Sequence, residues 1–399
     1  MCHGELQTPQ SAPKSGWTLT SGLVQGIMYL GAPLFLTLNR VYPRAFLWAP
    51  LTGLLIMCLS LGLSSLSTTV QHLIATQGVL YSIGGGTCYF PCLVYTDQWF
   101  VRRKGFAYGV MWSGTGLGGL TIPLLLQWLL GQYGFRTTLR VWAVVLFAMT
   151  APLVYFIRPR IPPARKGRMS KSSFTSLWNP IFFLYQITSV IQALGFFLPG
   201  VYLPTFARTT LGAGPFPAAL TVMVVNVALV FGCLAMGLLI DRFHPTTCIL
   251  ISSAGAAVGT FLLWGFATNM ALLYIFCIVY GLFAGSYTST WPGVMRDVNA
   301  RMETLARRQN GSTEQQPDSG SHDGGSTFDP MVVLGCLSAG RGVGNMASGP
   351  LSEAMLKTLP WEGEAAGAYG SGYGTLIAFT GATAALGGAT YLCRRVGWM

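Results

Sequence analysis

Long apolar runs alternate with short polar segments along almost the whole chain. Eleven of the runs are long enough to cross a bilayer as helices, which takes about 20 residues each. The runs lie at residues 17–39, 45–66, 71–95, 105–131, 138–157, 178–204, 216–240, 247–267, 271–294, 330–357 and 372–393. Glycine and proline are frequent inside them, as spanning helices tolerate. The pattern predicts an all-α, multi-pass membrane protein.

Polar segments divide these runs into groups. Residues 158–177 form a basic, proline-containing linker, so that five predicted helices lie in residues 17–157 and six in residues 178–399. A segment rich in Gly, Ser, Gln and Asp, residues 299–329, interrupts the second group and is predicted to be disordered. Residues 1–16 are polar, without the apolar core of a signal peptide. The predicted organisation is a short N-terminal segment followed by two helical halves.

The composition agrees with a membrane protein. Hydrophobic residues make up 52% of the 399 residues and charged residues only 9%, whereas soluble domains carry about 25% charged residues. Eighteen of the 24 Lys and Arg residues fall in one set of alternate loops and four in the other set. By the positive-inside rule, the first set and the C-terminus are predicted to be cytoplasmic. The net charge of +12 thus reflects membrane topology, and no nucleic-acid partner is expected.

Short motifs recur in the same order in the two halves. The segment NRVYP at residues 39–43 is matched by DRFHP at 241–245, and GTGLG at 114–118 is matched by GRGVG at 340–344. Such order indicates duplicated halves of six helices each. The duplication also predicts a twelfth helix before residue 17, where the chain is polar. The expectation is therefore a truncated or degenerate copy of a twelve-helix parent.

A further motif precedes and opens the fourth apolar run. The segment WFVRRKGFAYG at residues 99–109 places an aromatic residue and basic residues before a helix start made of small residues, and it runs on to Ser113 and Gly114. With the glycine-rich residues 116–119, the chain resembles the major facilitator superfamily, and within it the monocarboxylate-transporter-like group of fungal type. The resemblance implies two helical halves that rock about a site at the membrane midplane.

The sequence differs from that group at positions that couple transport to ions in its members. Its other signature, with a functional lysine in several members, lies in the first family helix, for which no counterpart is found here. The carboxylate–arginine pair of its proton-coupled members falls on Leu229 and Cys233. Neither side chain can carry a proton or bind a carboxylate. Proton symport of the lactate type is therefore not expected, while symport of another kind and uniport stay open.

Arg341 is a formal charge in the middle of the apolar run 331–350. At ~1.5 Å per residue it lies roughly 15 Å from the start of the run, where an arginine costs at least ~2.5–3.5 kcal/mol. Ser338, Arg341 and Asn345 share one helix face. Such a stripe is typical of a cavity wall that binds a carboxylate, although the arginine could instead satisfy helix-end carbonyls or another helix. Predicted companions, each of which could instead join helices, are Thr115, Asn226, Gln186 and Gln192.

Charged residues at the predicted cytoplasmic helix ends are candidates for a gate. Asp97 precedes Arg102 and Arg103, and Asp241 precedes Arg242. In the transporters that the chain resembles, such charges hold the cytoplasmic side closed. The alternative is an ordinary excess of positive charge on that side of the membrane.

The titratable residues argue against an enzyme. All four histidines lie in loops or near helix ends, whereas hydrolases and transferases within membranes need His, Asp or Cys side chains clustered at depth. The cysteines lack zinc-ligand spacing. The sequence therefore predicts no catalytic residue, no metal and no cofactor.

These features favour a secondary-active or facilitative transporter of a small organic anion or amphipathic metabolite. The alternatives are efflux of a hydrophobic secondary metabolite and a homologue that does not transport. The expected partners are a small-molecule substrate and the lipid bilayer, and the protein is expected to be a monomer. The plasma membrane is favoured over internal membranes.

Overall fold

The computed structural model describes residues 24–161, 179–310, 330–358, 361 and 363–397. Within them every regular element is a helix. Six helical stretches of these residues are long and apolar enough to cross a membrane, and the longest contains two of the predicted spans. The predicted all-α membrane fold is confirmed.

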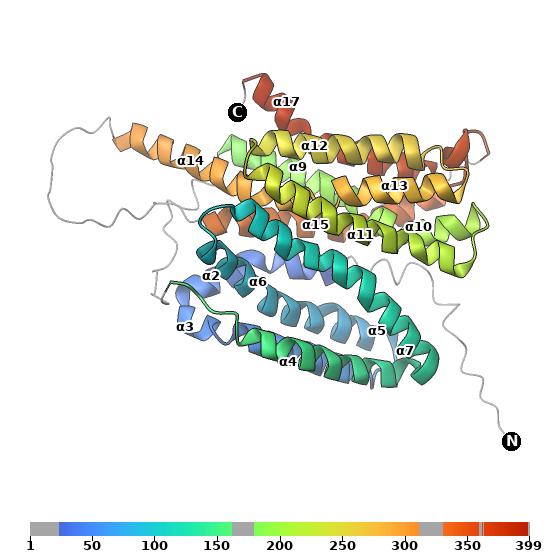
Figure 1. Cartoon of the computed structure of the whole chain (residues 1–399), viewed down its shortest axis with the longest axis horizontal. Helices are drawn as coiled ribbons and strands as arrows, with labels where there is room; N and C mark the ends of the chain where they lie inside the picture. The colour runs from blue at the N-terminus through green and yellow to red at the C-terminus, as the bar shows by residue number, and fades with distance from the viewer. Residues whose placement is uncertain (1–23, 162–178, 311–329, 359–360, 362, 398–399) are drawn as a thin grey trace.

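The helices form two groups that lie side by side, the first in blue to green and the second in yellow-green to red (Figure 1). After a helical segment at residues 24–30, the first group consists of α2 (Ala32–Val41), α3 (Pro43–Phe46), α4 (Ala49–Ser64), α5 (Val70–Leu73), the π-helical η2 (Ile74–Leu80), α6 (Tyr81–Trp99) and α7 (Lys104–Val154). The second group consists of α9 (Pro180–Phe196), α10 (Leu198–Thr209), α11 (Pro215–Ile240), α12 (Pro245–Val258), η4 (Gly259–Trp264), α13 (Met270–Phe283), η5 (Tyr287–Thr290), α14 (Trp291–Asn310), α15 (Pro330–Thr358), η6 (Gly367–Gly370), α16 (Gly374–Gly387) and α17 (Ala389–Arg395).

The two predicted spans inside α7 are separated by a sharp turn at Gly134. This residue has φ 72° and ψ 174°, outside the helical region. Glycine adopts positive φ without the steric cost that a Cβ imposes. The chain therefore reverses direction between residues 131 and 138, where the sequence predicts the break.

The predicted disordered segment 299–329 is wrong in its first part, because α14 continues to Asn310. Val298 is buried and Met302 packs against the same core cluster one turn later. Asp297 and Arg301 form an ion pair at the i, i+4 spacing, with 3.3 Å between Oδ1 and Nε. These contacts extend the helix through a polar sequence. Residues 311–329, like 1–16 and most of the linker 158–177, lie outside the described residues.

The two groups meet along a seam between α7 and α11. A Cβ atom added to Gly109 would lie 2.5 Å from the carbonyl oxygen of Cys233, and one added to Gly237 would lie 2.7 Å from the carbonyl oxygen of Gly105. Only glycine allows the two backbones to approach this closely. Figure 1 shows that α7 lies against α11 where α7 begins and diverges from it toward the other end.

A second seam joins α15 to the start of the first group. A Cβ added to Gly342 would lie 2.9 Å from the carbonyl oxygen of Gly26. The end of the molecule where α7 begins and α11 ends carries Arg102, Arg103 and Arg242, and it is called the basic end below. A core cluster with side chains from both groups lies toward this end.

Candidate functional site

Arg341 lies inside the helix bundle on α15, roughly 16 Å along the helix from Pro330. Its side chain is 2% exposed. One guanidinium nitrogen donates to Oε1 of Gln192 on α9 at 2.8 Å, and the guanidinium carbon lies 4.5 Å from the centre of the Phe196 ring. The two helices approach closely because Gly344 has no Cβ, which would lie 2.7 Å from the carbonyl oxygen of Val190.

Aromatic side chains of both helix groups lie within electrostatic range of this guanidinium. The phenol groups of Tyr29, Tyr89, Tyr280 and Tyr287 all interact with it electrostatically. The first two belong to the first group and the other two to the second group. Within the described residues no carboxylate pairs with Arg341. The charge is therefore buried between the two groups without a counter-ion among the described residues.

Polar atoms without partners lie on the same helix faces. Asn345, one turn from Arg341, is fully buried, and neither its Oδ1 nor its Nδ2 has a hydrogen-bond partner among the described residues. On α9, Oγ of Ser189 and Oε1 of Gln186 are also buried without a hydrogen-bond partner among the described residues. Buried polar groups of this kind normally bind water or a ligand. The set Gln186, Ser189, Gln192, Arg341 and Asn345 is called the Arg341 cluster below.

The structure brings together only some of the residues predicted for a substrate site. Gln186 reaches α15, where its Nε2 donates to the carbonyl of Cys336 at 2.8 Å. Ser338 is buried on α15. Asn226 donates to Val222 of its own helix at 2.9 Å and lies in the seam with α7. Thr115 is exposed and donates to Trp112 of its own helix at 2.6 Å. Substrate binding by any of these residues stays a prediction.

Aromatic neighbours of Arg341 were missed by the sequence reasoning. Phe196, Tyr89, Tyr280 and Tyr287 lie in apolar runs, where an aromatic residue gives no periodic signal that separates a site from lipid-facing surface. Two of them, Tyr280 and Tyr287, lie on either side of a break in the predicted helix 271–294, because α13 ends before η5 begins.

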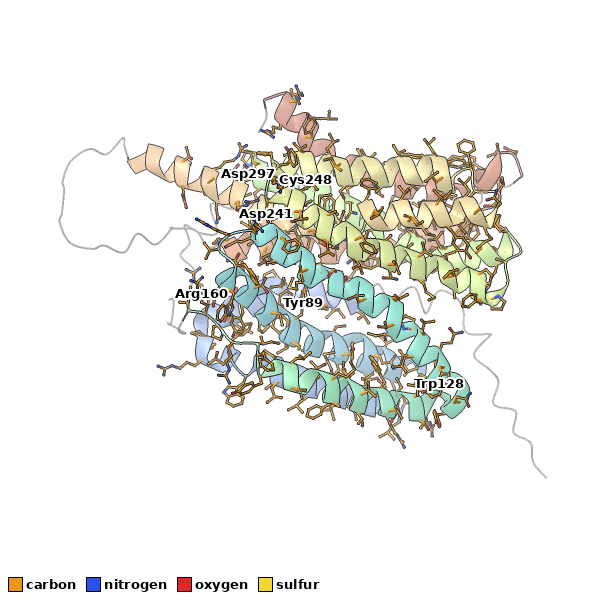
Figure 2. The ribbon with its side chains drawn as sticks, in the orientation of Figure 1. Tyr89, Trp128, Arg160, Asp241, Cys248 and Asp297 are labelled. Carbon is orange, nitrogen blue, oxygen red and sulfur yellow. The ribbon has the colours of Figure 1, made fainter. Side chains whose placement is uncertain are left out.

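An aromatic layer connects the two groups between α7 and α14. The rings of Trp112 and Trp291 meet edge to face with centroids 5.7 Å apart. Trp112 also donates from Nε1 to the hydroxyl of Tyr89 at 2.8 Å, and its ring lies 5.4 Å from that of Tyr108. Tyr108 donates to the carbonyl of Leu93 at 3.1 Å. Figure 2 shows Tyr89 on α6, within the first group.

Asp241 closes the basic end of the α7–α11 seam. Its two carboxylate oxygens accept from the backbone N–H groups of Gly105 at 2.8 Å and Phe106 at 2.9 Å. These are among the first N–H groups of α7, which have no partner within the helix and lie at the positive end of its dipole. A carboxylate of the second group thus caps a helix of the first (Figure 2).

Asp97, one of the predicted gate residues, lies near the end of α6. The ion pair of Asp97 is with Lys104, with 2.8 Å between Oδ1 and Nζ. Arg103 has φ 54° and ends the turn before α7, so that Lys104 is the first helical residue and reaches back to Asp97. Arg102, Arg103 and Arg242 are exposed. The gate role of these charges stays a prediction.

Replacing Asp241 by alanine is expected to loosen the start of α7. Loss of a capping carboxylate costs about 0.5–2 kcal/mol, and the amides of Gly105 and Phe106 should therefore exchange hydrogen roughly two- to thirtyfold faster. Hydrogen-exchange mass spectrometry of the peptide covering these residues measures the change. Glu303→Ala serves as the matched control, because it removes an exposed acidic side chain of α14 and leaves the start of α7 unchanged. Equal exchange in wild type and Asp241→Ala would contradict the capping role.

Comparison with known proteins gives one family and several relatives. Residues 8–304 match the family model of the Major Facilitator Superfamily. The chain is similar to "MFS-type transporter 1" of Ophiocordyceps sp. (strain BCC 1869), with 26% identity over 70% of this chain and 59% of that protein. It is also similar to the "Aspyridones efflux protein apdF" of Emericella nidulans, with 28% identity over 69% of this chain and 53% of that protein.

A solved structure has the same fold. The human organic anion transporter MFSD10 (TETRAN) superposes with a TM-score of 0.63 at 12% identity, covering 94% of this chain and 82% of that chain. The chain spans between 53% and 59% of the length of the two curated relatives named above.

Proposed function

The chain belongs to the major facilitator superfamily, and we propose that it exports an amphipathic organic anion by alternating access. The observation that carries the proposal is Arg341, which is buried between the two helix groups without a carboxylate partner among the described residues. A charge in this position is stabilised when an anionic ligand binds it.

The chemistry of the Arg341 cluster suits a carboxylate or enolate. A guanidinium has five N–H donors, and Gln192 accepts from one nitrogen of Arg341. An ionised oxygen forms stronger hydrogen bonds with such donors in a low dielectric than in water. The unpartnered amide of Asn345 can complete the contacts of the anion.

The surroundings of the cluster favour a cargo with an apolar body. The ring of Phe196 lies against the guanidinium, and Tyr89, Tyr280 and Tyr287 interact with it electrostatically. The similarity to a relative named as an efflux protein for aspyridones supports export of a secondary metabolite in particular. A short monocarboxylate is the second candidate, supported by the resemblance of residues 99–109 to the monocarboxylate-transporter-like group.

The transport cycle would use the two seams as its moving contacts. In this conformation the basic end is closed by Asp241 and by the glycine contacts of α7 with α11. With that end in the cytoplasm, as the positive-inside rule predicts, the conformation is the outward-facing one. Release of Asp241 from α7 would open the opposite, inward-facing state. The protein would work as a monomer in the plasma membrane, without catalytic chemistry.

Flux measurements with matched compounds test this proposal. The full chain in proteoliposomes should give saturable flux of an aromatic carboxylic acid and little flux of its methyl ester, because only the acid can bind Arg341. Protein-free liposomes correct for passive diffusion. Equal saturable flux of acid and ester would favour efflux of neutral hydrophobic metabolites. No saturable flux of any compound would identify a homologue that does not transport.

A further inference from the structure

A second cationic site lies at the basic end, on the outer side of the second helix group. A cavity of about 380 Å³ is lined by Thr247 of α12 and by Tyr391, Arg394 and Arg395 of α17. It is separate from the Arg341 cluster, with which it shares no residue. Two arginines, a threonine and a tyrosine therefore line one hollow.

Each of the two exposed arginines makes one hydrogen bond to a neighbouring side chain. Arg394 donates to Oγ1 of Thr246 at 3.2 Å, and Arg395 donates from Nε to the hydroxyl of Tyr391 at 3.3 Å. Each contact uses one of the donors of its guanidinium, so donors remain for a ligand. Side chains that are already oriented lose less entropy when a ligand binds.

The start of α12 adds a positive dipole but no free backbone donor at its first residues. His244 caps this helix, with Nδ1 accepting from the N–H of Thr246 at 3.3 Å and its carbonyl accepting from the N–H of Thr247 at 3.0 Å. Burial lowers the pKa of His244, while the charge of Asp297 acts in the opposite direction. The neutral ring keeps the lone pair that caps the helix. Side chains must therefore supply the hydrogen bonds to a ligand.

No carboxylate of the described residues neutralises the two arginines. His244 interacts electrostatically with both Asp297 of α14 and Arg394. Asp297 already has other partners, because it pairs with Arg301 at 3.3 Å and accepts a hydrogen bond from Tyr185 at 3.0 Å. Within the part of the chain that the structure describes, the positive charge of the cavity is thus left without a counter-ion.

We propose that this cavity binds the phosphate group of an anionic phospholipid. Arginine pairs match the geometry of phosphate oxygens, and the cavity lies at the end of the spanning helices, where headgroups lie. Leu392 of α17 and Val396, which directly follows α17, are 64% and 71% exposed and can contact acyl chains. Inorganic phosphate offers the same charge without this apolar contact, so the lipid is favoured.

Binding of a fluorescent short-chain phosphatidic acid to the purified full chain tests the site. Wild type should bind it, and the double variant Arg394→Gln/Arg395→Gln should bind roughly 30-fold more weakly, because each of the two charges near a headgroup contributes a factor of about five. The single variant Arg395→Gln, which leaves the contact of Arg394 with Thr246 intact, should bind roughly fivefold more weakly. Size-exclusion chromatography confirms that each variant is folded.

The matched control removes two arginines from the other helix group. Arg158 lies over the ring of Tyr155 at 4.3 Å, as Arg395 lies near that of Tyr391, and Arg160 is two residues away at the basic end. Arg158→Gln/Arg160→Gln should bind phosphatidic acid like wild type, which separates a defined site from general attraction of charge. Equal weakening by both double variants, or none by Arg394→Gln/Arg395→Gln, overturns the proposal. Displacement of the probe by inorganic phosphate as effectively as by unlabelled phosphatidic acid overturns the lipid assignment.

Discussion

Replacing Arg341 by glutamine should reduce kcat/KM for an anionic substrate about 30-fold or more. A buried, hydrogen-bonded charge pair that loses one partner costs about 2–5 kcal/mol, and each 1.4 kcal/mol is about a factor of ten. The side chain is 2% exposed, so water cannot replace the guanidinium. Initial rates of uptake into proteoliposomes over a range of substrate concentrations measure the effect.

The same variant separates a binding role from a structural one. Without substrate, the buried charge has no carboxylate partner among the described residues, and its replacement by a neutral side chain should leave thermal stability unchanged or raise it. If Arg341 instead stabilises the fold, Arg341→Gln will lower Tm and the flux per folded molecule will stay near the wild-type value. Arg341→Lys keeps the charge but not the planar fork, and it should give an intermediate rate.

An exposed arginine provides the control for the change in net charge. Arg140 of α7 lies on the surface and donates from Nε to Ser65 at 3.1 Å. Arg140→Gln should leave kcat/KM within about a factor of two, because a surface contact of this kind contributes little. A comparable loss of flux in both variants would show that the effect does not come from the Arg341 cluster.

The part of this site that sequence could predict is the part that lies on one helix. Spacing along 330–358 places Ser338, Arg341 and Asn345 on one face, and all three are buried. Periodicity alone does not say which neighbouring helix that face meets. The meeting with Gln192 depends on the close contact at Gly344, which joins residues far apart in the chain.

The candidate gate residues at the basic end show the same limit of prediction from sequence. Sequence placed Asp97 and Asp241 at helix ends, where both lie. It could not show that Asp241 reaches the backbone of α7, because the acceptors and donors are 135 or more positions apart. Nor could it show the left-handed turn at Arg103, which makes Lys104 the partner of Asp97. Chain reversals and seams between helices are set by packing of the whole bundle.

The position of Thr115 shows that the internal repeat does not by itself predict which residues contact each other. The internal repeat aligns it with Arg341, but its hydroxyl is exposed and bonded within its own helix. Duplicated halves share topology, and equivalent positions need not face the same space once side chains and helix tilts differ. The Arg341 cluster is accordingly built mainly from α9 and α15 of the second group.

Replacing Gly109 by valine should destabilise the protein by about 3 kcal/mol, at the upper end of the cost of overpacking. The added Cβ would lie 2.5 Å from the carbonyl oxygen of Cys233 and 3.2 Å from Cα of Gly237. Both are backbone atoms that cannot rotate away, so α7 and α11 must separate. Thermal unfolding of the purified protein, followed by intrinsic tryptophan fluorescence, measures the loss.

Gly114 of the same helix is the matched control for this variant. A Cβ at that position would have no neighbour within 4 Å, and any residue other than glycine or proline favours a helix interior relative to glycine by up to about 1 kcal/mol. Gly114→Val should therefore leave Tm unchanged or raise it slightly. If Gly109→Val and Gly114→Val unfold alike, the halves do not meet at the α7–α11 seam as the structure has them. If only Gly109→Val loses stability, and the amides of Gly105 and Phe106 then exchange faster as in Asp241→Ala, the seam and the cap form one closed gate.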